Sequence, residues 1–458
     1  MRGPDFEQID VLLADKTVVG ADFDDRSGGI DAEIRHAPLI SGDMIMKSSS
    51  ELLPQYGFLG SHSTGNVESP ESKVFLNTNV PFSAFICGVQ GSGKSHTTSC
   101  ILENALLPSR HLGRLENPVS ALVFSYGDFS SGGVGFSISE AAFLAGPNAA
   151  FPGHSRVKKI TVLTSPTNNA IRKRYERLPN VRAIPFTLDP RSLDIGNMLT
   201  LMAVNESAAT PLYMAKIESI LRDMARESED SVFDYLEFKE RLKLCEFMPA
   251  QSVALEQRLG VLESFLDMSG NAPQPKFRPG EVTIIDLSCP FVSANTACIL
   301  FKICLQRYLQ SQASGKMVVL DEAHKYMLNV PGARLLNDYL VSIIRLQRHY
   351  GARVVISTQE PTLLTDLIAL CSVTVIHRFT SPEWYNALRK HISIAADDKH
   401  ETLRRIETLT TGTALVYSSN AVLGKTEDGF LIKGDGRLLK LDIRKRVTSD
   451  GGQSVMSV

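Results

Sequence analysis

The sequence has little of several features that mark specialised classes of protein. Its seven cysteines include no Cys-x-x-Cys pair, so neither a disulfide framework nor a zinc module is expected. No uncharged apolar run approaches the roughly 18 residues of a membrane-spanning helix, and the first residues lack the apolar stretch of a signal peptide. The formal net charge of −2 excludes a uniformly basic nucleic-acid-binding chain, although it permits a local basic patch. We therefore expect a soluble intracellular protein, cytoplasmic or nuclear, with no membrane partner.

The composition is that of an ordinary globular protein, with 43% hydrophobic and 21% charged residues in 458. Short apolar runs alternate with segments of helical spacing. The runs predict strands at 82–87, 119–126, 160–163, 282–287, 317–320, 353–357, 373–377 and 413–417, and the spacing predicts helices at 94–107, 294–312 and 333–350. Strands that alternate with helices predict an α/β fold, with a mostly parallel sheet covered by helices on both faces.

The chain divides into five segments by composition and periodicity. Residues 1–75 are polar and weakly periodic, which predicts an irregular N-terminal extension. Residues 205–272 predict a helical insertion that separates two parts of a core, 76–204 and 273–430. Residues 431–458 contain Arg444-Lys445-Arg446 and are expected to form a basic C-terminal tail.

The segment Gly88-Val89-Gln90-Gly91-Ser92-Gly93-Lys94-Ser95 matches G-x-x-x-x-G-K-[ST] between a predicted strand and a predicted helix. The glycines allow backbone N–H groups to surround the phosphates of a nucleotide such as ATP at the helix N-terminus. Lys94 would reach the β- and γ-phosphates, and Ser95 would ligate Mg²⁺. The candidate nucleotide-contacting residues are Gly88, Gln90, Gly91, Ser92, Gly93, Lys94, Ser95 and His96, the last without a chemical reason of its own. The alternative is a glycine-rich turn with a solvated lysine.

A second motif places two carboxylates, Asp321 and Glu322, directly after the apolar run Met317–Leu320. A buried parallel strand ends at the same edge of the sheet as the phosphate-binding loop. There Asp321 would hold Mg²⁺ and Glu322 would polarise an attacking water. The alternative is a pair of acidic residues at the positive end of a helix.

Together these motifs resemble the HerA–FtsK superfamily of ring-forming P-loop ATPases (RecA/ASCE-like), specifically its HerA-like branch. The segments that carry the resemblance are Arg278–Ser288, Asp321-Glu322-Ala323-His324, Arg348-His349-Tyr350-Gly351, Val354–Pro361 and Thr411–Val416. The resemblance covers residues 76–425 except the helical insertion.

The resemblance implies roles for further residues. Gln359 corresponds to a polar sensor of the γ-phosphate and the attacking water. Arg348 corresponds to an arginine finger that enters the site of a neighbouring subunit, where a planar guanidinium suits the transferring phosphoryl group. Arg345 lies three residues earlier and is a rival, and Arg378 is a candidate third sensor. For Arg345 and Arg378 an exposed surface arginine is an equally good interpretation.

The resemblance also implies an activity and partners. We expect a Mg²⁺-dependent ATPase, assembled as a homo-oligomeric ring (a hexamer), that translocates double-stranded DNA as a helicase-like motor, with a nuclease as a candidate partner. A protein-translocating motor of the secretion type is one alternative. A nucleotide-gated assembly scaffold is another, against which Glu322, Gln359 and Arg348 together count.

A basic segment at 156–191 contains nine basic residues and two acidic ones. Such local charge would suit contacts with DNA phosphates. The candidate DNA-contacting residues are Lys158, Lys159, Arg172, Lys173, Arg174 and Arg177, and Tyr175 is a candidate for stacking on a base. The alternative is a solvated surface helix.

Overall fold

The computed structural model describes residues 25–63, 69–127, 137–151, 153–202, 212–227, 233–270, 275–392 and 399–451. Its centre is one mixed sheet of 16 strands. The strands are β1 (Leu39–Ser41), β2 (Tyr56–His62), β3 (Lys73–Leu76), β4 (Ser83–Cys87), β5 (Gly113–Arg114), β6 (Ser120–Ser125), β7 (Ile160–Thr164), β8 (Val181–Pro185), β9 (Val282–Asp286), β10 (Lys316–Leu320), β11 (Ala352–Thr358), β12 (Val373–Ile376), β13 (Thr413–Tyr417), β14 (Val422–Lys425), β15 (Leu431–Lys433) and β16 (Leu439–Ile443).

Eight neighbouring strands form a parallel block in the order β12-β4-β11-β10-β6-β9-β7-β8. Strands β4, β10 and β11 are buried along their whole length, which explains why they read as continuous apolar runs. β11 lies between β4 and β10, so the segments that follow these three strands meet at one carboxyl edge of the sheet. The predicted α/β fold and its core strands are confirmed.

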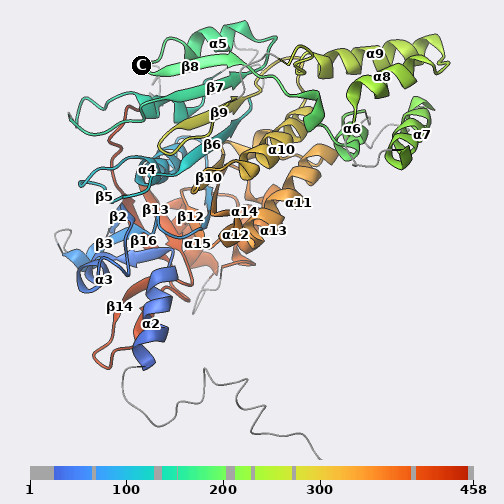
Figure 1. Cartoon of the computed structure of the whole chain (residues 1–458). Coiled ribbons are helices and arrows are strands. Elements are labelled where there is room, and N and C mark those ends of the chain that lie inside the picture. Colours follow the sequence, from blue (N-terminus) through green and yellow to red (C-terminus); the bar gives the residue numbers. More distant parts are fainter. Residues whose placement is uncertain are drawn as a thin grey trace, which may run out of the picture.

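Helices cover both faces of the parallel block (Figure 1). α4 and α5 pack on one face, and α10, α11, α13 and α14 pack on the other. The helices outside the insertion are α2 (Asp25–His36), α3 (Gly42–Lys47), α4 (Lys94–Leu106), α5 (Asn169–Tyr175), α10 (Ala294–Gln310), α11 (Pro331–Arg345), α12 (Gln347–Tyr350), α13 (Thr365–Leu370), α14 (Pro382–Arg389) and α15 (Lys399–Glu407). None of the helices in the described residues is long and apolar enough to cross a membrane.

The region of the predicted insertion is helical. It contains α7 (Leu212–Glu227), α8 (Tyr235–Lys243) and α9 (Pro249–Glu263), and α6 (Ile195–Met202) ends shortly before it. Figure 1 shows α7, α8 and α9 projecting beyond α10 on one side of the molecule. An aromatic contact between Phe186 and Phe265, with ring centroids 5.9 Å apart, joins the insertion to the end of β8.

The N-terminal segment differs from the sequence expectation, because residues 39–76 contribute β1, β2 and β3 to the sheet rather than an irregular extension. β2 includes Gly57 and Gly60, which disfavour strands by propensity. A Cβ on Gly60 would lie 2.4 Å from the carbonyl oxygen of Asp442 in β16. Glycine is therefore required there by the close approach of another strand, which local sequence does not reveal.

The C-terminal segment also differs from the expected tail. β16 pairs with β13 and β2, and the arginines that follow it, Arg444 and Arg446, are buried. The carboxylate of Glu103 in α4 is fully buried and accepts hydrogen bonds from Arg444 Nη1 (2.7 Å) and from Thr448 N and Oγ1 (2.9 and 2.6 Å). The segment after β16 is thus attached to the helix that follows the phosphate-binding loop. Residues 452–458 lie outside the described part of the chain.

Candidate nucleotide-binding site

The phosphate-binding loop connects β4 to α4 in the conformation that its glycines allow. Gly91 and Gly93 have φ values of 74° and 111°, in the left-handed region, and Gly93 is the N-cap of α4. At Gly88 a Cβ would come within 2.7 Å of Ser92 Oγ, so a side chain is excluded there. Ser92 Oγ donates to the carbonyl oxygen of Val89 at 2.7 Å and closes the turn. The backbone at a helix N-terminus is therefore arranged to receive an anion.

Lys94 is buried at the first position of α4, with its side chain 4% exposed. Its Nζ donates to the carbonyl oxygen of Val89 at 3.1 Å and lies 3.9 Å from Glu322 Oε1. Burial lowers the pKa of Lys94, and the neighbouring Glu322 opposes that shift. The ammonium group is thus held between the phosphate-binding loop and the second acidic motif.

Glu322 follows β10 with φ 48° and ψ 45°, a left-handed conformation that costs a non-glycine residue of the order of 1–3 kcal/mol. Its Oε2 accepts a hydrogen bond from Gln359 Nε2 at 2.9 Å and lies 3.6 Å from His324 Nε2 and 3.9 Å from Lys325 Nζ. Oε1 faces Lys94. One oxygen of the carboxylate is therefore fixed by the protein, and the other is directed to the loop.

Asp321, Ser95 and Glu140 line one small cavity beside α4. Burial, reinforced by the nearby charge of Glu322, raises the pKa of Asp321 to about 7. Ser139 Oγ donates to Asp321 Oδ2 at 3.4 Å. A hydroxyl and a buried carboxylate are ligands that suit Mg²⁺, which takes oxygen donors and completes its shell with phosphate and water. A cation here would stabilise the ionised form of Asp321, so the residues fit the ion that the sequence predicted.

His377 is a site residue that the sequence analysis did not select. Its ring is fully buried under the phosphate-binding loop, with Nε2 2.9 Å from Thr97 Oγ1 of α4. Its backbone N–H donates to Cys87 O at 2.8 Å, and Val89 N donates to Arg378 O at 2.9 Å. The β12–β4 pairing therefore continues into the loop. The sequence could have indicated this position, because the predicted strand 373–377 ends with His377 at the same edge of the sheet as the phosphate-binding loop.

Two of the residues predicted to contact the nucleotide, Gln90 and His96, are placed differently from the others. Gln90 is exposed on the loop, on its solvent side. Nε2 of His96 forms a hydrogen bond of 2.8 Å with the carbonyl oxygen of Arg444. In this structure His96 therefore holds the C-terminal segment against α4, which supplies a physical reason for a histidine at that position.

The three candidate arginines occupy different places. Arg348 is exposed on α12, which ends two residues before β11 begins, so it lies at the amino edge of the sheet. β11 is seven residues long, about 20 Å, and Gln359 follows its other end. Arg345, at the end of α11, is exposed near the same edge. Arg378 instead follows β12 at the carboxyl edge, beside the phosphate-binding loop.

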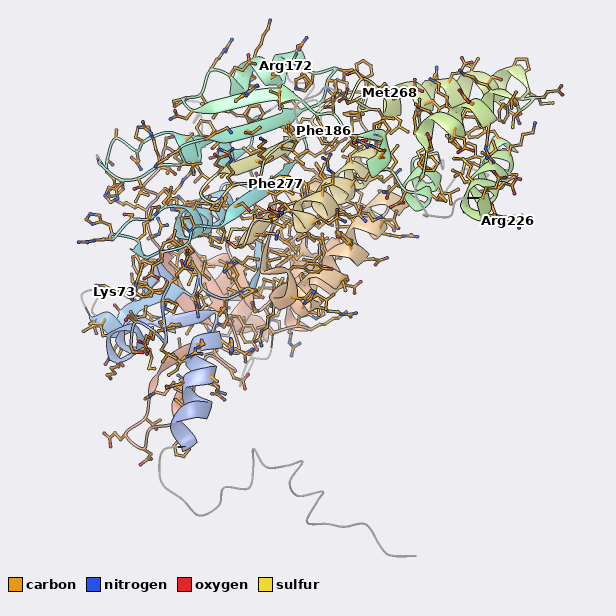
Figure 2. All side chains as sticks on the ribbon, in the orientation of Figure 1. Lys73, Arg172, Phe186, Arg226, Met268 and Phe277 are labelled. Carbon is orange, nitrogen blue, oxygen red and sulfur yellow. The ribbon has the colours of Figure 1, made fainter. Side chains whose placement is uncertain are left out.

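The basic segment gathers around β7, β8 and α5. Lys158, Lys173 and Arg177 are exposed, and Lys159 pairs with Glu281 at 3.5 Å. Arg172 and Arg174 are half-buried on α5. Figure 2 labels Arg172 on this helix. Ile160 N donates to Asn180 O at 3.0 Å, so the start of β7 and the residues after α5 lie together at the amino edge.

Tyr175 cannot stack on a base, because its side chain is fully buried. Its hydroxyl donates to Asp286 Oδ2 at 2.5 Å and accepts from Ser139 N at 2.8 Å. The helical period of α5 turns Tyr175 toward the sheet while its basic neighbours remain at the surface. Tyr175 is thus part of the core beneath the segment that leads to the Asp321 cavity.

Comparison with known proteins supports the fold. No protein-family model and no curated protein sequence matches the chain. VirB4 of Thermoanaerobacter pseudethanolicus is similar in structure, with a TM-score of 0.51 and 11% identity over 80% of this chain and 89% of VirB4. The bacterial conjugative coupling protein TrwB has a TM-score of 0.43 and 13% identity over 82% of this chain and 89% of TrwB. The genome-packaging NTPase B204 from Sulfolobus turreted icosahedral virus 2 has a TM-score of 0.27 and 10% identity over 78% and 98%.

At such identities the likeness concerns the fold, and the VirB4 comparison carries it because its TM-score exceeds 0.5. The order of β4, β11 and β10 and the loop between β4 and α4 agree with this result. The chain therefore has the P-loop NTPase fold that its motifs predicted.

Proposed function

We propose that the protein is a Mg²⁺-dependent ATPase that drives a ring-shaped motor, with double-stranded DNA as the translocated substrate. The observation that carries the ATPase part is the position of Glu322, fixed by Gln359 at 2.9 Å and facing Lys94 at 3.9 Å. A switch that only binds nucleotide does not require an oriented carboxylate at this place, whereas hydrolysis benefits from one.

Some side chains of the site would bind the nucleotide, and others would act in its hydrolysis. The loop N–H groups and Lys94 bind the phosphates, and Lys94 balances the charge that develops on the leaving group. Glu322 Oε1 orients a water molecule and accepts its proton, while Gln359 keeps Oε2 in place. Ser95 and Asp321 would hold Mg²⁺, which supplies neutralisation of the β- and γ-phosphate oxygens when bound. TrwB has been crystallised with ADP and Mg²⁺, which accords with this assignment.

The position of Arg348 supports assembly into a ring. Within one chain Arg348 and the phosphate-binding loop lie at opposite edges of the sheet, separated by about the 20 Å length of β11. Arg348 therefore has no route to its own site, and its guanidinium is available to the site of a neighbour. Arg378 is the arginine that could complete the site within the same chain.

The choice of DNA as substrate rests on the basic residues at the end of the sheet. Lys158, Lys173 and Arg177 expose their charges over β7 and α5, away from the carboxyl edge that holds the phosphate-binding loop. A surface of this sign can contact a phosphate backbone without competing with the nucleotide. In the ring we propose, this surface faces the DNA.

The test is ATP turnover measured with double-stranded DNA, with an unfolded polypeptide, and with neither, across a range of salt concentrations. We expect DNA to stimulate turnover and the stimulation to fall steeply as salt rises. The triple variant K158Q/K173Q/R177Q should lose stimulation and keep the basal rate, whereas Lys94→Ala should lose both. Stimulation by polypeptide alone would assign the motor to protein transport, and slow turnover under all conditions would favour an assembly scaffold.

A further inference from the structure

A second concave site lies between α10 and the β7–β8 end of the sheet. It has a volume of about 270 Å³. Its floor contains Leu163 of β7 and Ile285 of β9, which are direct neighbours in the parallel ladder. Phe186, just after β8, and Phe277, in the segment before β9, also line it. Figure 2 labels both side chains. The cavity is thus enclosed by the C-terminal half of α10 and by the segments 186–188 and 275–277.

The polar groups of the cavity come mainly from one face of α10. Arg307 and Ser311 are four residues apart, and Cys304 is three residues before Arg307, so all three line the same wall. Lys276 adds a second cation at the mouth. The lining contains no Asp or Glu, so the site is an apolar chamber with positive charge at its rim.

The charge of Arg307 lies near the carboxylate of Asp189 and interacts with it at a distance, without direct bonding. Among the described residues its guanidinium has no hydrogen bond or ion pair. The nearby carboxylate of Asp189 is already bound by Arg191, from Nε to Oδ1 at 3.1 Å and from Nη2 to Oδ2 at 2.7 Å. An arginine presents a planar fork that matches a carboxylate or sulfonate. A half-buried arginine without a partner beside an apolar chamber is suited to an anionic ligand.

We propose that this cavity binds a small aromatic monoanion, with its ring between Phe186 and Phe277 and its acidic group on Arg307. The volume is slightly below the roughly 300–1,000 Å³ of sites for drug-sized ligands, which favours a compact compound of up to three rings over a nucleotide. Aromatic side chains at the sides favour a flat ligand. The site is separate from the phosphate-binding loop, because β7 and β9 lie beyond β6 and β10 in the sheet.

Occupation of the cavity would connect two parts of the molecule. Phe186 contacts Phe265 of the insertion, and Phe277 makes an edge contact with Tyr308 of α10 at 4.7 Å between ring centroids. A ligand between the two phenylalanines would therefore touch side chains that pack on the insertion and on α10. This gives the site a physical connection to the helical insertion that does not depend on the nucleotide.

The test uses 8-anilinonaphthalene-1-sulfonate, an aromatic anion whose fluorescence rises in apolar surroundings, and N-phenyl-1-naphthylamine, its uncharged analogue. Titrations are made with the nucleotide site blocked by a non-hydrolysable ATP analogue. We expect one saturable site for the anion, at least tenfold weaker in Arg307→Gln and only partly restored in Arg307→Lys, which keeps the charge but lacks the planar fork. The uncharged analogue should bind wild type and Arg307→Gln alike. Arg226→Gln, an exposed arginine on α7, is the matched control.

A second variant, Thr187→Trp, places a bulky ring at the cavity wall and should abolish binding of both probes. Circular dichroism verifies that each variant is folded. The proposal is overturned if the anion shows no saturable site in the wild type, if Arg307→Gln binds it as tightly as the wild type, or if the ATP analogue displaces it. Each of these results leaves the ATPase proposal standing, because the first two concern only the second cavity and the third would place the probe in a site that still binds the ATP analogue.

Discussion

Gln359 Nε2 donates a hydrogen bond of 2.9 Å to Glu322 Oε2, and the two residues come from the ends of adjacent strands, β11 and β10. The contact leaves Glu322 Oε1 directed to Lys94. The Gln359 amide thus fixes Oε2 of Glu322, whereas Oε1 is not held by that bond. This arrangement gives each substitution at the site a different expected effect.

Glu322→Gln should keep nucleotide binding and lower ATP turnover by about 10²–10⁴-fold, because it removes the group that accepts the proton of the attacking water. Gln359→Leu should retain the carboxylate but lose its orientation, so its turnover should fall less. Phosphate release and binding of a fluorescent ATP analogue measure the two effects separately. Unchanged turnover in Glu322→Gln would place the general base elsewhere.

Lys94→Ala should abolish ATP binding at millimolar nucleotide without unfolding the chain, since it removes the cation that the loop holds beside Glu322. Isothermal titration calorimetry measures the binding, and thermal unfolding verifies the fold. Lys325→Ala is the matched control, because Lys325 also lies 3.9 Å from Glu322 but is outside the loop. A Lys94→Ala variant that binds ATP like the wild type would contradict the assignment of the loop.

Arg348→Ala should bind ATP and hydrolyse it poorly if, as we propose, Arg348 acts in the site of a neighbouring subunit. Mixing Arg348→Ala with Glu322→Gln should restore some turnover, since some interfaces then combine an intact Glu322 with an intact Arg348. Wild-type activity should also rise more than linearly with protein concentration below the midpoint of assembly.

Full activity in a strictly monomeric wild-type protein would exclude this role for Arg348, and so would unchanged turnover in Arg348→Ala. Arg378→Ala should respond differently in the same mixing experiment. It lies beside the loop of its own chain, so its defect should persist when it is mixed with Glu322→Gln.

Stability should fall as the solution becomes acidic, in part because of His377. Burial, with a smaller contribution from Lys94, lowers the pKa of His377 from 6.5 to about 3. Between these values only the unfolded chain binds the proton, so unfolding becomes more favourable as pH falls through that window. The contribution is of the order of 1 kcal/mol per pH unit. His377→Asn should be less stable at pH 7 but should lose less stability between pH 6.5 and 4, as measured by urea unfolding. A variant with the wild-type slope would contradict the buried neutral ring.

Glu103→Gln should lower the free energy of unfolding by about 3–5 kcal/mol, because it leaves Arg444 buried without its counter-charge. Asp43→Asn is the matched control, since it breaks the surface pair with Lys47 and should change stability by less than about 1 kcal/mol. Denaturant midpoints of the two variants provide the measurement. Equal midpoints would mean that the pair does not stabilise the fold.

The parts of the fold that sequence predicted are those in which local pattern and final environment agree. The core strands are buried on both faces, so each appears as an uninterrupted apolar run such as Met317–Leu320. The phosphate-binding loop is equally local, because the glycines themselves permit its shape. Once the strand ends were placed, their meeting at one edge followed from parallel topology, which is why Lys94, Glu322 and Gln359 were found together.

The remaining parts depend on contacts between distant segments. Gly60 sits in a strand only because Asp442 approaches it from β16. Local sequence predicts that Arg444 is an exposed basic residue. The fold instead buries it beside Glu103, which is 341 positions earlier. His377 acquires its role from Thr97, 280 positions away. These contacts join residues that are far apart in the sequence, so the local sequence pattern does not predict them.

The bond between Glu103 and Arg444 has a consequence for synthesis of the chain. Ribosomes add about 5–20 residues per second, so the 341 positions between the two residues take roughly 20–70 seconds to make. During that time α4 carries a carboxylate whose buried partner does not yet exist. The far end of α4 is therefore synthesised early, but its buried ion pair forms only when the last strand of the sheet has been made. A nascent chain that stops before residue 444 would leave the Glu103 carboxylate without its counter-charge.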